Sequence, residues 1–152
     1  MNTIKPIFQT PNNKHYFFGY YDKSPVNLDG TKHLALEVDF LDHLPNKDDL
    51  AVIGYFDIKL NNSIFHKLTE TKTFNWQQGC MLQWFGDKNT NIIYNDLVDR
   101  KFVSIIMDIN TKEKTILPMS IYSLSPSNEF ALCIDYERHY WVRRSYGYDG
   151  VI

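Results

Sequence analysis

The sequence has little of what marks several specialised protein classes. Its 152 residues include only two cysteines, and no apolar run approaches the ~18 residues of a membrane span or forms the core of an N-terminal secretion signal. No set of cysteines and histidines has the spacing of a zinc site. These absences argue against a disulfide-rich, membrane or structural-zinc protein. We therefore expect a cytoplasmic protein in which Cys80 and Cys133 are buried, reduced thiols rather than a disulfide.

An excess of charge of one sign is also missing. Sixteen Lys and Arg residues balance eighteen Asp and Glu residues, for a formal charge of −2. A protein that binds a phosphate backbone usually carries a strong positive excess. We therefore expect neither a nucleic acid nor a membrane as a partner.

Aromatic residues are what the sequence has in abundance, at 15% of the chain. Aromatic side chains favour strands, and short apolar runs alternate here with clusters of Pro, Asn, Asp and Gly, which is typical of strands and turns. No segment keeps a 3.6-residue apolar period for three turns. The sequence therefore predicts an all-β fold with little helix.

Two internal matches indicate a repeat. Ser24, Trp84 and Ser125 each follow an apolar strand and precede a second one, at spacings of 60 and 41 residues. Asp57 and Asp108 each end a later apolar strand at a polar turn. Four strands in about 41 residues, repeated along the chain, are typical of the blades of a β-propeller. A plain antiparallel sandwich of short strands is the alternative.

The repeat predicts antiparallel four-stranded blades in one partial β-propeller domain. Blade one covers residues 15–74 with an inserted loop at 41–50, blade two covers 75–118, and an incomplete blade three covers 119–152. A closed propeller needs about four to eight blades, so about two and a half blades would form the N-terminal portion of one. We expect the remaining blades, or a self-association partner, to cover the exposed blade face.

A first candidate site follows from three small residues. Gly19, Gly79 and Ser120 each precede a repeat anchor by five positions, where an innermost strand would crowd against the propeller axis. Polar and aromatic residues flank the two glycines, and ring stacking with planar hydrogen-bonding groups suits a saccharide ligand. The alternative is that the aromatic residues pack between blades and the glutamines bond the backbone. The candidate ligand-binding residues are Tyr20, Tyr21, Asp22, Gln77 and Gln78.

A second candidate lies at residues 135–145, which combine acids, arginines and aromatic residues. Strand alternation would place Arg138 and His139 on opposite faces, and such groups suit an acidic sugar or a phosphate. The alternative is a solvated strand–turn–strand with salt bridges. No catalytic motif occurs in the sequence, so we expect no catalytic residue, metal ligand or cofactor in this chain.

The turn Ser24-Pro-Val-Asn-Leu-Asp-Gly30, the turn Ser125-Pro-Ser-Asn128 and the strand-ending Asp57 and Asp108 resemble TolB-type propeller repeats. The resemblance spans nearly the whole chain through loose motifs. The second repeat lacks Ser-Pro, and the third lacks Asp-Gly. The stretches Tyr20-Tyr-Asp-Lys-Ser-Pro25 and 76–84 more weakly resemble oligogalacturonate-lyase-like propellers.

Three functions remain open at this point. The first is a non-catalytic binding or scaffold portion of a bacterial TolB-like propeller, which the resemblance links to polysaccharide metabolism. The second is a fragment of a metal-dependent lyase-like enzyme acting on acidic sugars. In that family the manganese ligands lie in later blades, so no ligand can be assigned in this sequence. The third is the propeller domain of a peptidase.

Overall fold

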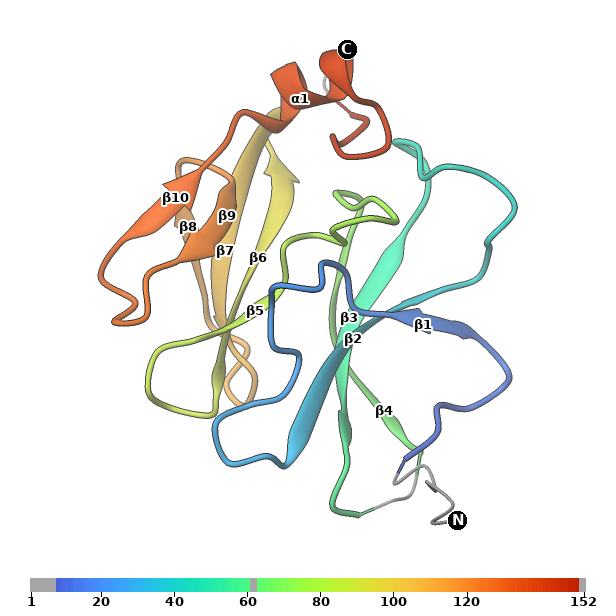
Figure 1. The fold of residues 1–152 in the computed structure, drawn as a ribbon, viewed down its shortest axis with the longest axis vertical. Coiled ribbons are helices and arrows are strands. Elements are labelled where there is room, and N and C mark those ends of the chain that lie inside the picture. Colours follow the sequence, from blue (N-terminus) through green and yellow to red (C-terminus); the bar gives the residue numbers. More distant parts are fainter. Residues whose placement is uncertain (1–7, 61–62, 151–152) are drawn as a thin grey trace, which may run out of the picture.

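The computed structural model describes residues 8–60 and 63–150, which form mostly antiparallel β-structure (Figure 1). The strands of the first sheet lie in sequence order: β1 (His15–Phe17), β2 (Lys32–Val38), β3 (Ala51–Asp57) and β4 (Phe65–Thr71). The second sheet repeats this order: β5 (Gln83–Phe85), β6 (Asn91–Val98), β7 (Lys101–Asp108) and β8 (Lys114–Leu117). A two-stranded sheet of β9 (Ile121–Leu124) and β10 (Ala131–Cys133) follows, and then helix α1 (Tyr136–Val142). The predicted all-β class and the antiparallel four-stranded sheets are confirmed.

The second sheet is packed on both faces, because side chains alternate sides along its strands. Ile92 and Tyr94 of β6 belong to a core shared with β2 and β3 of the first sheet. Ile93, between them, belongs to a second core with Ile121 of β9 and Tyr136 of α1. The three sheets are therefore stacked as layers, with the second sheet in the middle.

One buried side chain fastens the middle layer to the third. Asn95 of β6 is fully buried, and its amide oxygen accepts from the Ile121 amide at 2.7 Å while its Nδ2 donates to the Ile121 carbonyl at 2.9 Å. The same Nδ2 donates to the Tyr148 hydroxyl at 3.1 Å. One amide group thus holds β9 and the segment after α1 against the second sheet.

The two long sheets share an atomic detail at the turn after their third strand. Asp57 Oδ1 accepts from the amides two and three residues later, at 3.1 and 3.2 Å. Asp108 Oδ1 does the same at 2.8 and 3.0 Å. Such side-chain turns are a standard use of aspartate, and their recurrence supports the repeat that was read from the sequence.

The third repeat departs from the prediction after β10. Residues 136–142 form helix α1 rather than a strand, so the expected alternation of Arg138 and His139 on opposite strand faces is wrong. Asp135 caps the helix by accepting from the Arg138 amide at 3.0 Å, and Glu137 lies in the first turn, where a negative charge is favourable. The N-cap at Asp135 and the acidic first turn therefore favour a helix over a strand in this segment.

The remaining expectations concern the loop and the cysteines. Residues 41–50 do form a loop between β2 and β3. Both cysteines are free, but only Cys80 is buried, while Cys133 is partly exposed because it lies in β10 at the edge of the stack. None of the described helical residues forms a span long and apolar enough to cross a membrane.

Candidate functional site

The first part of the site is a pair of tyrosines in the loop after β1. The ring centroids of Tyr20 and Tyr21 are 4.5 Å apart, and Tyr21 is 88% exposed while Tyr20 is half-buried. The Lys23 amide donates to the Tyr20 carbonyl at 3.2 Å, which closes a tight turn behind the rings. The ring planes are tilted by 37°, so the pair offers an angled aromatic surface to a ligand, mostly through the exposed ring of Tyr21.

Two further tyrosines come from the third layer. A hydrogen bond with Tyr21 raises the pKa of Tyr20 to about 12, with contributions from burial and from the neighbouring phenols of Tyr146 and Tyr122. Burial raises the pKa of Tyr122, and nearby Asp22 and Tyr21 raise it further. Tyr20 and Tyr122 therefore stay protonated at neutral pH and can donate hydrogen bonds. We name Tyr20, Tyr21, Tyr122 and Tyr146 the tyrosine cluster.

Lys23 joins the first-sheet loop to β9. Its side chain is only 8% exposed, its ammonium contacts the Asp22 carboxylate at 2.7 Å, and it lies 5.0 Å from the centre of the Tyr122 ring. It also donates to the Ser123 hydroxyl at 3.4 Å. The charge of the predicted site residue Asp22 is thus balanced by Lys23, and both residues reach toward the tyrosine cluster.

The predicted glutamines lie in a turn between β4 and β5. Asn75 Oδ1 accepts from the amides of Gln77 at 3.0 Å and Gln78 at 2.7 Å, and Asn75 Nδ2 donates to the Tyr146 carbonyl at 2.9 Å. Gln77 is exposed, whereas Gln78 is 4% exposed and its Oε1 has no hydrogen-bond partner among the described residues. Gln78 therefore holds a buried acceptor whose hydrogen-bonding capacity is unused among the described residues.

The backbone segments that contain the predicted glycines, Gly19 and Gly79, lie against each other. A Cβ added to Gly19 would lie 2.7 Å from the Gln78 carbonyl oxygen, and one added to Gly79 would lie 2.9 Å from the Phe18 carbonyl oxygen. Both have positive φ, at 132° and 57°. Neither lies in a regular strand, which corrects the expectation of paired innermost strands. Because the backbones touch, Gln78 is brought next to the loop that carries Tyr20.

The second predicted set is divided by helix α1. The His139 ring centroid lies 6.2 Å from that of Tyr146, at the edge of the tyrosine cluster. Arg138 is exposed on the helix surface. The guanidinium of Arg143, just after the helix, lies 4.2 Å from the Tyr146 ring.

A groove of about 610 Å³ is lined by Asp22 and Lys23, which adjoin the tyrosine cluster in the sequence. Trp84 lies along it, and the matching turns at Ser24 and Ser125 form its walls. The Trp84 indole donates to the Pro25 carbonyl at 2.8 Å, which fixes the ring across two repeats. The structure therefore has an aromatic cluster and an open groove with both polar and apolar lining residues.

Sequence reasoning did not single out Lys23, Asn75 or Tyr146 as site residues. An Asn that begins a short turn is a recognisable signal for Asn75. Tyr146 follows a helix that the sequence pattern did not predict, and Lys23 acts through β9, so neither carried a local signal. In residues 8–60 and 63–150, no group of three or more His, Cys, Asp or Glu side chains is arranged to hold a metal ion.

Comparison of the chain with protein-family models, curated proteins and solved structures finds no match.

Proposed function

We propose that this chain is a non-catalytic, saccharide-binding portion of a TolB-like β-propeller, linked to polysaccharide metabolism. The observation that carries the proposal is the tyrosine cluster next to Gln78. Segments of three successive repeats meet there, as ligand-binding segments would at the mouth of a propeller.

The chemistry of the cluster suits a sugar. Sugar rings present apolar C–H faces together with hydroxyl groups, so they pair with aromatic rings and with fixed hydrogen-bonding groups. Tyr20 and Tyr21 provide the rings, and the unpartnered Oε1 of Gln78 provides a buried acceptor. A ligand hydroxyl would remove the cost of leaving that acceptor unpaired.

The stacking of the layers supports the propeller part of the proposal. Each long sheet keeps its strands in sequence order, and the middle sheet packs through both faces. Beside the third layer, several large apolar side chains are exposed: Phe130, Leu132, Trp141 and Val142. A further blade of the propeller would cover them, and self-association of this chain through the same face would argue for a different assembly.

The test is a titration of the ¹⁵N-labelled chain with soluble oligosaccharides, neutral glucose oligomers and galacturonate oligomers, followed by chemical shifts. We expect weak binding that shifts the signals of residues 19–23 and 77–79. Tyr21→Ala should weaken it at least tenfold, and Trp141→Ala, another exposed aromatic residue, should leave it unchanged.

The two neighbouring glutamines give the sharpest pair of variants. Gln78→Ala should weaken binding by roughly 5- to 150-fold, because a buried polar partner is worth about 1–3 kcal/mol, while Gln77→Ala should have little effect. Equal affinity in both variants, or no shift with any oligosaccharide, would overturn the proposal. Formation of an unsaturated uronide with added Mn²⁺ would favour a lyase instead.

A further inference from the structure

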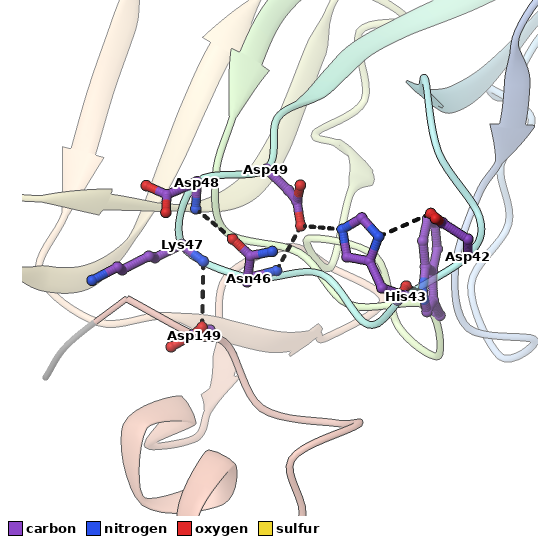
Figure 2. Close-up of polar contacts among 8 residues, drawn as sticks. Asp42, His43, Asn46, Lys47, Asp48, Asp49 and Asp149 are labelled. Atoms are coloured by element: carbon purple, nitrogen blue, oxygen red, sulfur yellow. Dashed lines mark hydrogen bonds and ion pairs between the residues drawn. The ribbon is translucent and has the colours of Figure 1, made fainter.

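The loop at residues 41–50 contains a histidine held between two carboxylates. His43 Nδ1 lies 2.9 Å from Asp42 Oδ1, and its Nε2 lies 3.0 Å from Asp49 Oδ2 (Figure 2). Asp49 Oδ2 also accepts from the Asn46 amide at 2.9 Å. The imidazole therefore joins the first part of the loop to its last part.

The geometry selects one protonation state of the ring. An ionised carboxylate only accepts hydrogen bonds, and a neutral imidazole has a single N–H to donate. With both ring nitrogens against carboxylates, only the imidazolium can donate to both. The His43 ring also stacks on Phe40, with centroids 4.3 Å apart and planes within 11°, and an aromatic face favours a cation over a neutral ring.

The same loop is attached to two distant parts of the chain. The Trp76 indole donates to the His43 carbonyl at 2.8 Å, across to the turn before β5. The Lys47 amide donates to Asp149 Oδ2 at 3.3 Å, in the segment after α1 (Figure 2). In Figure 1 this loop runs along the top of the first sheet toward the C-terminal segment. The conformation of the loop thus affects contacts between the first layer and the rest of the molecule.

We propose that His43 is a proton-operated latch that holds the 41–50 loop across Trp76 and against Asp149 while the imidazole is protonated, and releases it on deprotonation. Leu41 and Trp76 line a cavity of about 420 Å³, together with His15 and Phe17 of β1. Release of the latch changes the position of two of the walls of this cavity. The inference does not depend on the saccharide proposal.

The charged groups around His43 favour the protonated imidazole, and so the latched form of the loop. Asp42 and Asp49 raise the pKa of His43 above its usual 6.5 through hydrogen bonds, and the contact with His43 lowers the pKa of Asp42. The uncharged ring of Phe40 stacks on the imidazole, and the uncharged indole of Trp76 bonds the His43 carbonyl. Further charged or titratable groups near the loop have no described contact to the imidazole. They are Lys47 and Asp48 along the loop, Asp149 at the Lys47 amide, Lys14 and His15 across the cavity, and Asp39 beside Lys14.

The pH dependence follows from the sign of the shift. A histidine whose pKa is raised in the latched form stabilises that form fully below its ordinary pKa of about 6.5 and loses this effect as the pH rises through the raised pKa. Each unit by which the pKa is raised corresponds to about a tenfold change in the ratio of latched to released loop. The measured pKa of His43 therefore predicts how much the ratio of latched to released loop changes with pH.

The test is a pH titration of the full chain between pH 5.5 and 9 by NMR. It would follow the His43 ring, the Trp76 indole N–H, and the exchange protection of the Asn46 and Lys47 amides relative to their intrinsic rates. We expect His43 to titrate above pH 6.5, with the Trp76 signal and the loop protection changing at the same midpoint. The fall in protection should match the tenfold-per-unit relation.

Three variants separate the latch from a general effect of pH. Asp49→Asn keeps an oxygen acceptor for the Asn46 amide but removes the charge, so the midpoint should fall. His43→Gln should leave the loop signals independent of pH, and His15→Gln, at an exposed histidine of the same cavity, should leave the midpoint unchanged. A His43 pKa at or below 6.5, or loop signals that ignore the His43 titration, would overturn the proposal.

Discussion

The second sheet and the β9–β10 sheet occupy neighbouring layers but have very different surroundings. Ile92 and Ile93 of β6 face opposite sides of the second sheet, and both are almost completely buried. Leu132 of β10 is as apolar as either, yet it is 61% exposed. The difference comes from the neighbours rather than from the strand sequence: the second sheet has a layer on each side, whereas β10 has one outer face without a described neighbour.

The comparison shows what a strand of this fold needs for stability. One sheet of this type cannot bury both of its faces by itself, so most of its apolar burial depends on the adjacent layers. Substitutions at positions that the adjacent layers bury should therefore be costly, and equivalent substitutions at exposed edge positions should be nearly neutral.

The largest effect is expected from a matched pair of isoleucines in the second sheet. Ile92→Ala removes a fully buried side chain and should lower the free energy of unfolding by about 2–5 kcal/mol. Ile116→Ala, on the edge strand β8 where the side chain is 55% exposed, should cost less than about 0.5 kcal/mol. Denaturant unfolding of both variants measures the difference, and equal losses would mean that the layers do not determine stability.

A somewhat smaller effect is expected at Asn95, whose hydrogen bonds join the second and third layers. Asn95→Ala leaves the backbone N–H and C=O of Ile121 without their partner in a buried position, which should cost about 2–4 kcal/mol. Asn110→Ala, at an exposed turn position, is the control and should cost little. If Asn95→Ala unfolds at the same denaturant concentration as the wild type, Asn95 does not hold the two layers together.

Trp84 tests the contact between the repeats on the groove side. Trp84→Ala should cost about 2–3 kcal/mol, below the value for a fully buried tryptophan, because the ring is half-buried and loses one hydrogen bond to Pro25. Trp141→Ala, at an exposed position on α1, should be close to neutral. Thermal or denaturant unfolding compares the two, and a loss at Trp84 no greater than at Trp141 would contradict the packing described here.

The smallest effect is expected at the repeated aspartate turn. Hydrogen bonds from the backbone amides of Thr111 and Asn110 lower the pKa of Asp108. A lowered pKa stabilises the fold above the ordinary value of about 3.9, and this stabilisation is lost as the pH falls through the folded pKa.

Asp108→Asn keeps the acceptor oxygen but does not titrate, so its melting temperature should fall less than that of the wild type between pH 6 and pH 3. The difference should be roughly one to three degrees. Asp87→Asn, at an exposed position, should follow the wild type. If the melting temperature of Asp108→Asn falls with acid as much as that of the wild type, the charge of Asp108 does not stabilise the turn.

The fold was predictable from the sequence where the signals were local and repeated. Alternating apolar residues and turn residues predicted the strands, and the match between Asp57 and Asp108 predicted turns that the structure builds in the same way. Helix α1 was not predicted, because a seven-residue helix capped by Asp135 is too short to show a helical period.

The candidate site was harder to predict because it is assembled from distant segments. The flanking glycines made Tyr20, Tyr21 and Gln78 candidates, and they stay a prediction. The contribution of Tyr146 depends on Asn75, which bonds a carbonyl 71 residues away. Lys23 likewise acts by reaching Ser123, 100 residues along the chain. Contacts of this kind follow from the stacking of the layers, and a pattern within one segment does not contain them.

Amide hydrogen exchange measured strand by strand tests the central claim most directly, which is that coverage by neighbouring layers decides the stability of each sheet. Exchange in the native state reports how readily each element opens. We predict that the amides of β6 and β7 exchange most slowly, and that those of β10 exchange much faster. Equal protection of β10 and β6, or faster exchange in β6, would contradict the account.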